Sequence, residues 1–330
     1  MTGSPSRRAV IGALGVATAL ARKGAQAGAQ GPGWQPRQPV RVIVGFAAGT
    51  SADRLARYLA VPLSESLGVP VVVENRPGAG GSIGLEAVAR AEPDGQVVGM
   101  GGPEPLAIHP ALASARPQFD PARSLTPVIH LTEQPNVLLT SPGLPADGLS
   151  EFRAWALAHP QEPFASPGSG TSHHLTGLAI ARALRAQWRH VPDGGRVSAH
   201  ADLLAGRLRL MVDDIATALP LIRDGRMKAA LVSTAERSPL LPQVPSFTEL
   251  GIPGLASWQG ILGPAGLPAP VLARLNAAFA AALASPAVAE WLREAGATSV
   301  AGPPERFAAF LAAERLRWAA LVGEHDVKVN

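Results

Sequence analysis

The chain has 330 residues, of which 47% are hydrophobic and 16% charged, and these proportions exclude a disordered chain or a coiled coil. Its formal net charge of +4 arises in the first 30 residues, which hold four basic residues and no acid, so that 25 basic and 25 acidic residues remain beyond them. No basic stripe with interleaved aromatic residues is present, which argues against nucleic-acid binding. The absence of cysteine excludes disulfides and thiolate chemistry.

The N-terminus has the pattern of an export signal. An arginine pair at 7–8 precedes the apolar run 9–21, which is too short to span a bilayer comfortably, and the Ala-Gln-Ala sequence at 25–27 offers a cleavage site. We therefore expect residues 1–30 to be a signal peptide and the mature protein to be periplasmic. The arginine pair resembles a twin-arginine signal, and an ordinary signal peptide is the alternative.

Strand-like and helix-like segments alternate along the rest of the chain. Strands are expected at 40–46, 69–74, 96–100, 136–141, 163–166, 207–212, 227–233 and 257–262. Helices are expected at 52–67, 82–91, 149–158, 172–186, 198–205, 216–224, 270–284, 287–295 and 304–322. Such alternation predicts an α/β fold with largely parallel sheets.

Two proline- and glycine-rich segments, at 140–145 and 238–254, interrupt this alternation. They predict two domains. The first domain would comprise residues 36–140 together with 255–330, and the second residues 141–254.

The first candidate ligand loop lies between an expected strand and an expected helix. Free backbone N–H groups at a helix start favour an anion, and small residues let a ligand approach the backbone, so this loop is predicted to cradle a carboxylate. The alternative is that Thr50, Ser51 or Asp53 is only a helix N-cap. The candidate residues are Phe46, Ala47, Ala48, Gly49, Thr50, Ser51 and Asp53.

A second loop, at 164–174, repeats the order of strand, small polar loop and helix start. Two such loops in separate domains can face each other across a cleft, where ligands commonly bind. The alternative is that Gly168 and Gly170 only form a tight turn. The candidate residues are Ser166, Gly168, Ser169, Gly170, Thr171 and His174.

Catalytic and metal-binding patterns are not supported. Adjacent residues on a helix point about 100° apart, so His173 and His174 do not chelate one ion together, and no metal-ligand spacing is present; we expect no metal and no cofactor. A triad of Ser169, His174 and Asp213 lacks the Gly-x-Ser-x-Gly nucleophile turn. Asp213, at the end of an expected strand, is instead a candidate to orient a ligand hydroxyl or ammonium, or else it or Asp214 caps the next helix.

Several strings point to one family. They are Gly-Phe-Ala-Ala-Gly-Thr-Ser at 45–51, Glu-Asn-Arg-Pro-Gly-Ala-Gly-Gly at 74–81, Pro-Asp-Gly at 93–95, Asp-Leu-Leu-Ala-Gly at 202–206 and Pro-Ala-Gly-Leu-Pro at 264–268. With them the chain resembles the tripartite tricarboxylate transporter substrate-binding proteins, also called Bug receptors, from about residue 38 to residue 322.

The resemblance implies a two-domain periplasmic binding protein, or clam-shell, in which each domain is a mostly parallel sheet flanked by helices. It implies a small organic carboxylate held between the domains by the two loops and Asp213, and a membrane permease as partner. We expect a monomer that is not an enzyme. The alternatives are a ligand-sensing or scaffold protein of the same fold without a transport role and, as a weaker candidate, an enzyme using His174 and the acids.

The chain departs from the family pattern at four positions. Ala48 and Thr50 replace a proline and a glycine of the first loop, and Asp193 and Gly194 replace a tyrosine and a lysine. An acid at 193 facing the cleft would repel a second ligand carboxylate. We therefore expect a monocarboxylate, or a zwitterion whose amine meets Asp193 or Asp213.

Overall fold

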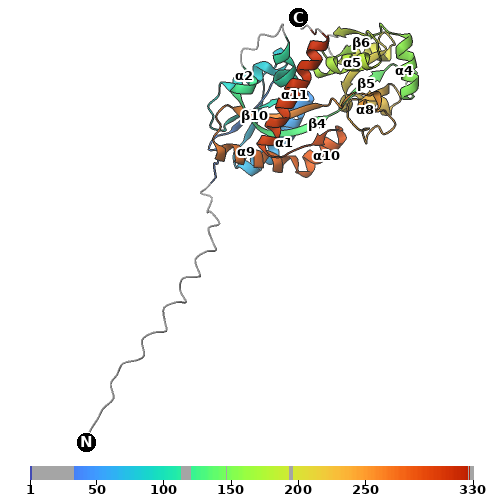
Figure 1. Cartoon of the computed structure of the whole chain (residues 1–330). Coiled ribbons are helices and arrows are strands. Elements are labelled where there is room, and N and C mark those ends of the chain that lie inside the picture. Colours follow the sequence, from blue (N-terminus) through green and yellow to red (C-terminus); the bar gives the residue numbers. More distant parts are fainter. Residues whose placement is uncertain (2–32, 113–119, 146, 193–195, 326, 328–330) are drawn as a thin grey trace. The chain divides into compact units, whose positions relative to one another are not determined.

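The computed structural model describes Met1 and residues 33–112, 120–145, 147–192, 196–325 and 327. The chain divides into two units, Met1–Gly33 and Trp34–Asn330. The expected signal peptide therefore lies outside the described residues, apart from Met1, and the fold below is that of the second unit (Figure 1).

The first sheet has six strands in the order β11-β4-β10-β3-β1-β2. Strand β1 pairs in parallel with β2 and β3, and β10 runs antiparallel to β3 and β4. The strands are β1 (Val40–Val44), β2 (Val71–Asn75), β3 (Val97–Gly101), β4 (Leu125–Gln134), β10 (Ser257–Pro264) and β11 (Thr298–Ser299). The helices that accompany it are α1 (Ser51–Leu67), α2 (Ser82–Ala89), α3 (Pro121–Ser124), α9 (Ala269–Leu283) and α10 (Pro286–Glu294).

The second sheet has five strands in the order β7-β6-β8-β5-β9. Strand β6 pairs in parallel with β7 and β8, and β5 runs antiparallel to β8 and β9. The strands are β5 (Asn136–Thr140), β6 (Pro163–Ser166), β7 (Arg189–Pro192), β8 (Leu210–Asp214) and β9 (Lys228–Val232). The helices here are α4 (Leu149–Ala158), α5 (Ser172–Ala183), α6 (Arg196–Leu204), α7 (Ile215–Arg223) and α8 (Phe247–Leu250).

The predicted α/β class and its two sheets are confirmed, but each sheet is mixed. Parallel pairing, as predicted, is found among β1, β2 and β3 and among β6, β7 and β8, the groups that carry the two candidate loops. Strands β10 and β5 are antiparallel to the strands of these groups that they pair with. Strand β4 was not predicted, because Pro127 and five polar residues interrupt its apolar pattern. Only Pro135 separates β4 from β5, so one extended segment passes from the first sheet to the second. The domain boundaries stay a prediction, with β5 now assigned to the second sheet.

Helix α11 (Pro304–His325) contributes to the cores of both sheets (Figure 1). Its Phe307 and Leu311 pack in the cluster around β10, and its Trp318 packs with Phe164 and Leu175 in the core of the second sheet. The first sheet is covered on its other side by α1, whose buried leucines recur every four residues on one helical face. The two sheets are therefore joined through apolar packing as well as through the chain.

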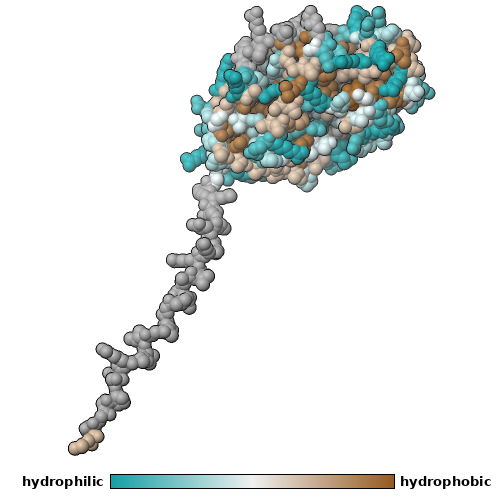
Figure 2. Space-filling model, in the orientation of Figure 1, coloured by the Kyte–Doolittle hydropathy of each residue, from teal (hydrophilic) through white to brown (hydrophobic). Residues whose placement is uncertain are grey.

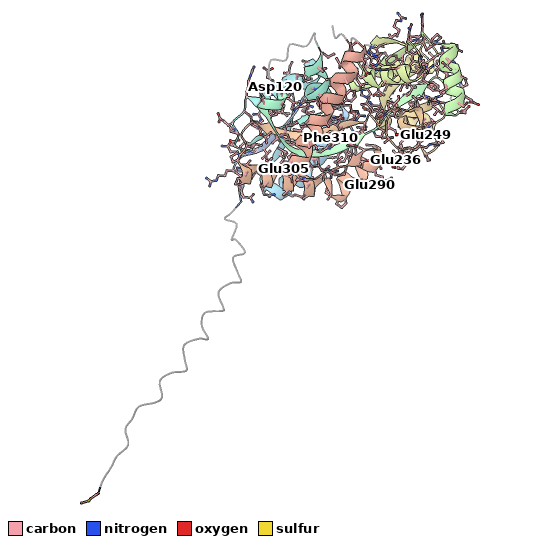
Figure 3. All side chains as sticks on the ribbon, in the orientation of Figure 1. Asp120, Glu236, Glu249, Glu290, Glu305 and Phe310 are labelled. Atoms are coloured by element: carbon pink, nitrogen blue, oxygen red, sulfur yellow. The ribbon has the colours of Figure 1, made fainter. Side chains whose placement is uncertain are left out.

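A buried carboxylate joins these cores. Glu314 of α11 accepts hydrogen bonds from the indole nitrogens of Trp258 and Trp318, both at 2.8 Å. Trp258 belongs to the β10 cluster and Trp318 to the core of the second sheet. Phe310, labelled in Figure 3, covers this region by packing against the rings of His130 and Trp258.

Apolar surface on the described part of the chain is scattered rather than gathered. The face drawn in Figure 2 mixes hydrophilic and hydrophobic residues, and the exposed large apolar side chains, such as Val61 and Leu316, come from different elements. No single described helix is both long and apolar enough to cross a membrane; α9 and α10 reach that standard only together, with a 65° bend between them.

We expect Glu314→Ala to lower the free energy of unfolding by about 2–4 kcal/mol, because two buried indole N–H groups lose their acceptor. Urea unfolding followed by tryptophan fluorescence measures this. Glu305→Ala, at the exposed start of the same helix (Figure 3), should cost less than about 1 kcal/mol. Equal losses in the two variants would contradict the role given to Glu314.

Candidate functional site

The two candidate loops share one local geometry. Each follows the carboxyl end of a parallel strand, β1 or β6, and each ends in the sequence Gly-Thr-Ser before a helix. Gly49 has φ +86° and Gly170 has φ +73°, in the left-handed region that favours glycine. The same turn is therefore built twice, once on each sheet.

A threonine caps the helix in both loops. Thr50 Oγ1 donates to the carbonyl of Ala47 at 2.8 Å, and Thr171 Oγ1 donates to the carbonyl of Gly168 at 2.7 Å. Each hydroxyl also accepts the backbone N–H three residues further along the chain. Thr50 is thus an N-cap, and a carboxylate contact by its loop stays a prediction; both hydroxyl protons are already used within the loops.

The third helical residue completes each turn. Asp53 Oδ2 accepts the N–H of Gly49 at 2.8 Å, and His174 Nδ1 accepts the N–H of Gly170 at 3.2 Å. Both side chains are buried. The immediate partner of each is thus its own loop, and a direct ligand contact by either stays a prediction.

Asn75, at the end of β2, holds the first loop in place. Its Nδ2 donates to the carbonyl of Phe46 at 3.0 Å and to Asp53 Oδ1 at 2.9 Å, while Arg57 bonds both Asp53 and Asn75. Burial alone would raise the pKa of Asp53, but its bonds from Arg57, Gly49 and Asn75 outweigh burial and hold that pKa below its usual value. The sequence analysis included Asn75 only as part of a family string. Its position at the end of a predicted strand could have indicated that it supports the neighbouring loop.

A histidine pair lies beneath the second loop. The rings of His174 and His190 stack with centroids 3.8 Å apart, and His190 Nε2 lies 2.7 Å from Ser166 Oγ. Because Ser166 donates its proton to the carbonyl of Gly168, we assign Nε2 of His190 as the donor. Burial, with a smaller contribution from the neighbouring histidines, lowers the pKa of His174 to about 3, and burial lowers that of His190 to about 4. Ser166 is fully buried and supports the loop from below.

The acids at the end of β8 bond to two further histidines. Asp213 Oδ2 lies 2.8 Å from His200 Nε2, and Asp214 Oδ1 lies 2.9 Å from His173 Nε2. The ligating atoms of His173, Asp213 and Asp214 lie within 4.8 Å of one another, a grouping that the sequence spacing did not indicate. His173 and His174 take different partners, as their helical positions require. Asp193 and Gly194 lie outside the described residues.

The two helix starts differ in what their N–H groups meet. Within the described residues, the N–H groups of Ser51 and Ala52 have no hydrogen-bond acceptor, and the preceding loop residues 47–49 are exposed. At the start of α5, by contrast, the N–H of Ser172 donates to Glu104 Oε1 at 2.9 Å. Glu104 was not among the predicted site residues, and Ser169 makes no hydrogen bond with other described residues.

A separate surface hollow of about 540 Å³ lies where α5 and α11 end. It contains none of the predicted ligand residues. Its lining residues are Leu178, Ala181, Arg182, Arg185, Ala186, Gln187, Trp188, Glu324 and His325.

Comparison with solved structures defines the class of protein. MatC of Rhodopseudomonas palustris, solved with bound malate, gives a TM-score of 0.75 at 33% identity, covering 87% of this chain and 99% of that chain. Another R. palustris protein, solved with adipate, gives 0.78 at 32% identity, covering 88% and 98%. The two sheets with their flanking helices form the fold of a periplasmic binding protein.

Sequence comparison gives the family. A family model described as the tripartite tricarboxylate transporter family receptor matches residues 55–327. BugT of Bordetella pertussis is 35% identical over 299 residues, covering 89% of this chain and 91% of that protein. The chain belongs to this receptor family, as its motifs predicted, and is a solute-binding protein rather than an enzyme.

We expect the free energy of unfolding to fall as the pH drops from about 7 to about 4. His174 and His190 take up protons near pH 6.5 when unfolded but only at pH values of about 3 and about 4 when folded, so the unfolded state binds more protons across this range. Each histidine contributes up to about 1.4 kcal/mol per pH unit. Urea unfolding between pH 7 and pH 4.5 measures the slope.

His190→Gln provides the matched variant, because glutamine keeps a donor near the Nε2 position but does not ionise. Its pH slope should be smaller than that of the unchanged protein. Identical slopes would show that His190 is not held neutral by the fold.

Proposed function

We propose that this chain is a periplasmic receptor that binds a small organic carboxylate at the start of α1 and delivers it to the permease of a tripartite carboxylate transporter. The observation that carries the proposal is the pair of N–H groups on Ser51 and Ala52, which have no acceptor within the described residues. They lie at the carboxyl end of β1, beside an exposed small-residue loop.

The physical case is that of an anion at a helix start. The first N–H groups of a helix have no intrahelical partner, and the helix dipole adds positive potential there. Helix α1 is 17 residues long, so its dipole is well developed. Asn75, Asp53 and Arg57 fix the loop through hydrogen bonds among themselves and to the backbone, so less ordering is needed when a carboxylate binds.

The relatives support the ligand class. MatC was solved with malate and a second relative with adipate, and both are small carboxylates. We assign the same broad class to this chain, together with the two loops and Asp213 as the lining of its ligand site. Export by the segment 1–30 is part of the proposal, because a periplasmic receptor must cross the inner membrane.

Delivery requires the protein to signal that it is loaded. The segment that joins β4 to β5 and helix α11 both connect the two sheets, so they are the places where a hinge motion would be absorbed on closing around a ligand. A sensing or scaffold role would need the same binding site, and only coupling to a permease separates it from transport.

The proposal is tested by removing one N–H group without disturbing the helix. Ser51 is the first residue of α1, a position that favours proline, and Thr50 has ψ 164°, which a following proline tolerates. We expect Ser51→Pro to weaken carboxylate binding about tenfold or more in isothermal titration calorimetry. The melting temperature without ligand should stay nearly unchanged.

Ser51→Ala is the matched control, because it removes the hydroxyl and keeps the N–H group. Its affinity should stay closer to that of the unchanged protein than to that of Ser51→Pro. If Ser51→Pro binds carboxylates as tightly as Ser51→Ala, the start of α1 is not the anion site.

A further inference from the structure

Glu104 places a carboxylate at the start of helix α5. It is the first residue of the short turn η2 (Glu104–Ile108) that follows β3, and its Oε1 accepts the N–H of Ser172 at 2.9 Å. Glu104 and Ser172 are both buried. The second of the two matching loops therefore already holds an anion, and that anion belongs to the protein.

Among the described residues, no ion pair balances the charge of this carboxylate. No described lysine, arginine or histidine forms an ion pair with Glu104 within 4 Å. Burial lowers the pKa of His109 and favours its neutral ring, and it outweighs the charge of Glu104, which opposes this lowering. The negative charge of Glu104 is therefore offset mainly by the N–H group and dipole of α5.

The turn η2 that carries Glu104 packs against both cores. Leu106 belongs to the cluster around β10, whereas Ala107, Ile108 and Leu112 belong to the same core cluster as Leu175 of α5. The contact between Glu104 and Ser172 therefore joins a turn that follows β3 of the first sheet to the start of α5 in the second.

The side chain of Ser172 gives an independent sign of a polar site. Ser172 Oγ is buried and has no hydrogen-bond partner within the described residues. A buried hydroxyl without a partner is uncommon. Its capacity to donate and to accept is therefore unused, on the same residue whose N–H group binds Glu104.

We propose that Glu104 makes this receptor select ligands with a single carboxylate, whose other end is an uncharged polar group or an ammonium. The inference rests on the proposed function: the ligand carboxylate binds at the start of α1, and its far end meets the loop that Glu104 already occupies. A second carboxylate there would face a buried like charge. For charges about 10 Å apart at an effective dielectric of about 20, this costs a factor of about 10 in affinity.

Three six-carbon acids of matched length test the selection by calorimetry. Adipate ends in a carboxylate, its half-amide adipamate ends in a neutral amide, and 6-aminohexanoate ends in an ammonium. We expect adipate to bind about tenfold more weakly than adipamate, and 6-aminohexanoate at least as tightly as adipamate. The four-carbon series of succinate, succinamate and 4-aminobutanoate covers a shorter site.

The matched variant is Glu104→Gln, which keeps an acceptor for Ser172 and removes the charge. It should bring the affinity for each diacid to within about threefold of that for its half-amide, and should remove the advantage of the ammonium. A merely structural role would change all affinities together and leave these ratios as they were. Glu305→Gln, on the exposed start of α11, should leave every ratio unchanged.

The outcomes separate this inference from the function on which it rests. If diacids bind the unchanged protein as tightly as their half-amides, or if Glu104→Gln leaves the ratios unaltered, the selection by Glu104 is wrong and carboxylate binding stands. If Glu104→Gln does not fold, the ratios in the unchanged protein decide alone. If none of the six acids binds, the proposed function fails, and this inference fails with it.

Discussion

The hydrogen bonds that close the two Gly-Thr-Ser turns are the interactions on which the candidate site depends. A helix that starts directly after a strand has several N–H groups without intrahelical partners. Here a threonine hydroxyl and the side chain of Asp53 or His174 satisfy the groups that shape each turn. What remains open at the start of α1 is therefore a fixed pair of donors on a preformed loop, which is the arrangement an anion needs.

The two halves reach this turn with different supporting residues. In the first, the charged pair of Asp53 and Arg57 holds the loop together with the neutral amide of Asn75. In the second, neutral buried histidines do so, with Ser166 between His190 and the loop carbonyl. The charged pair stays ionised near neutral pH, whereas the histidines must remain unprotonated, so acid weakens the second loop first.

Several contacts connect the two sheets and so hold the two loops within one structure. Helix α11 enters both cores, and Glu314 accepts an indole N–H from each. The turn that carries Glu104 follows a strand of the first sheet and packs in the cores of both sheets. The two loops match in backbone geometry but differ at the first helical N–H group: that of Ser51 has no acceptor within the described residues, whereas that of Ser172 donates to Glu104. Under the proposed function, a ligand with unlike ends fits such a site better than a symmetric diacid.

The sequence by itself determined the α/β class, most helices and strands, the receptor family and the two loops, because these depend on local periodicity, glycine positions and short strings. The mixed sheets, β4, and the roles of Asn75 and Glu104 were decided only by the tertiary structure. Glu104 and Ser172 are 68 positions apart, and no local pattern records that their chain segments meet. Likewise, the bond between His200 and Asp213 joins a helix to a strand end. Long-range packing determines which polar groups remain available to a ligand. No single stretch of sequence shows which groups these are, because their partners lie far away along the chain.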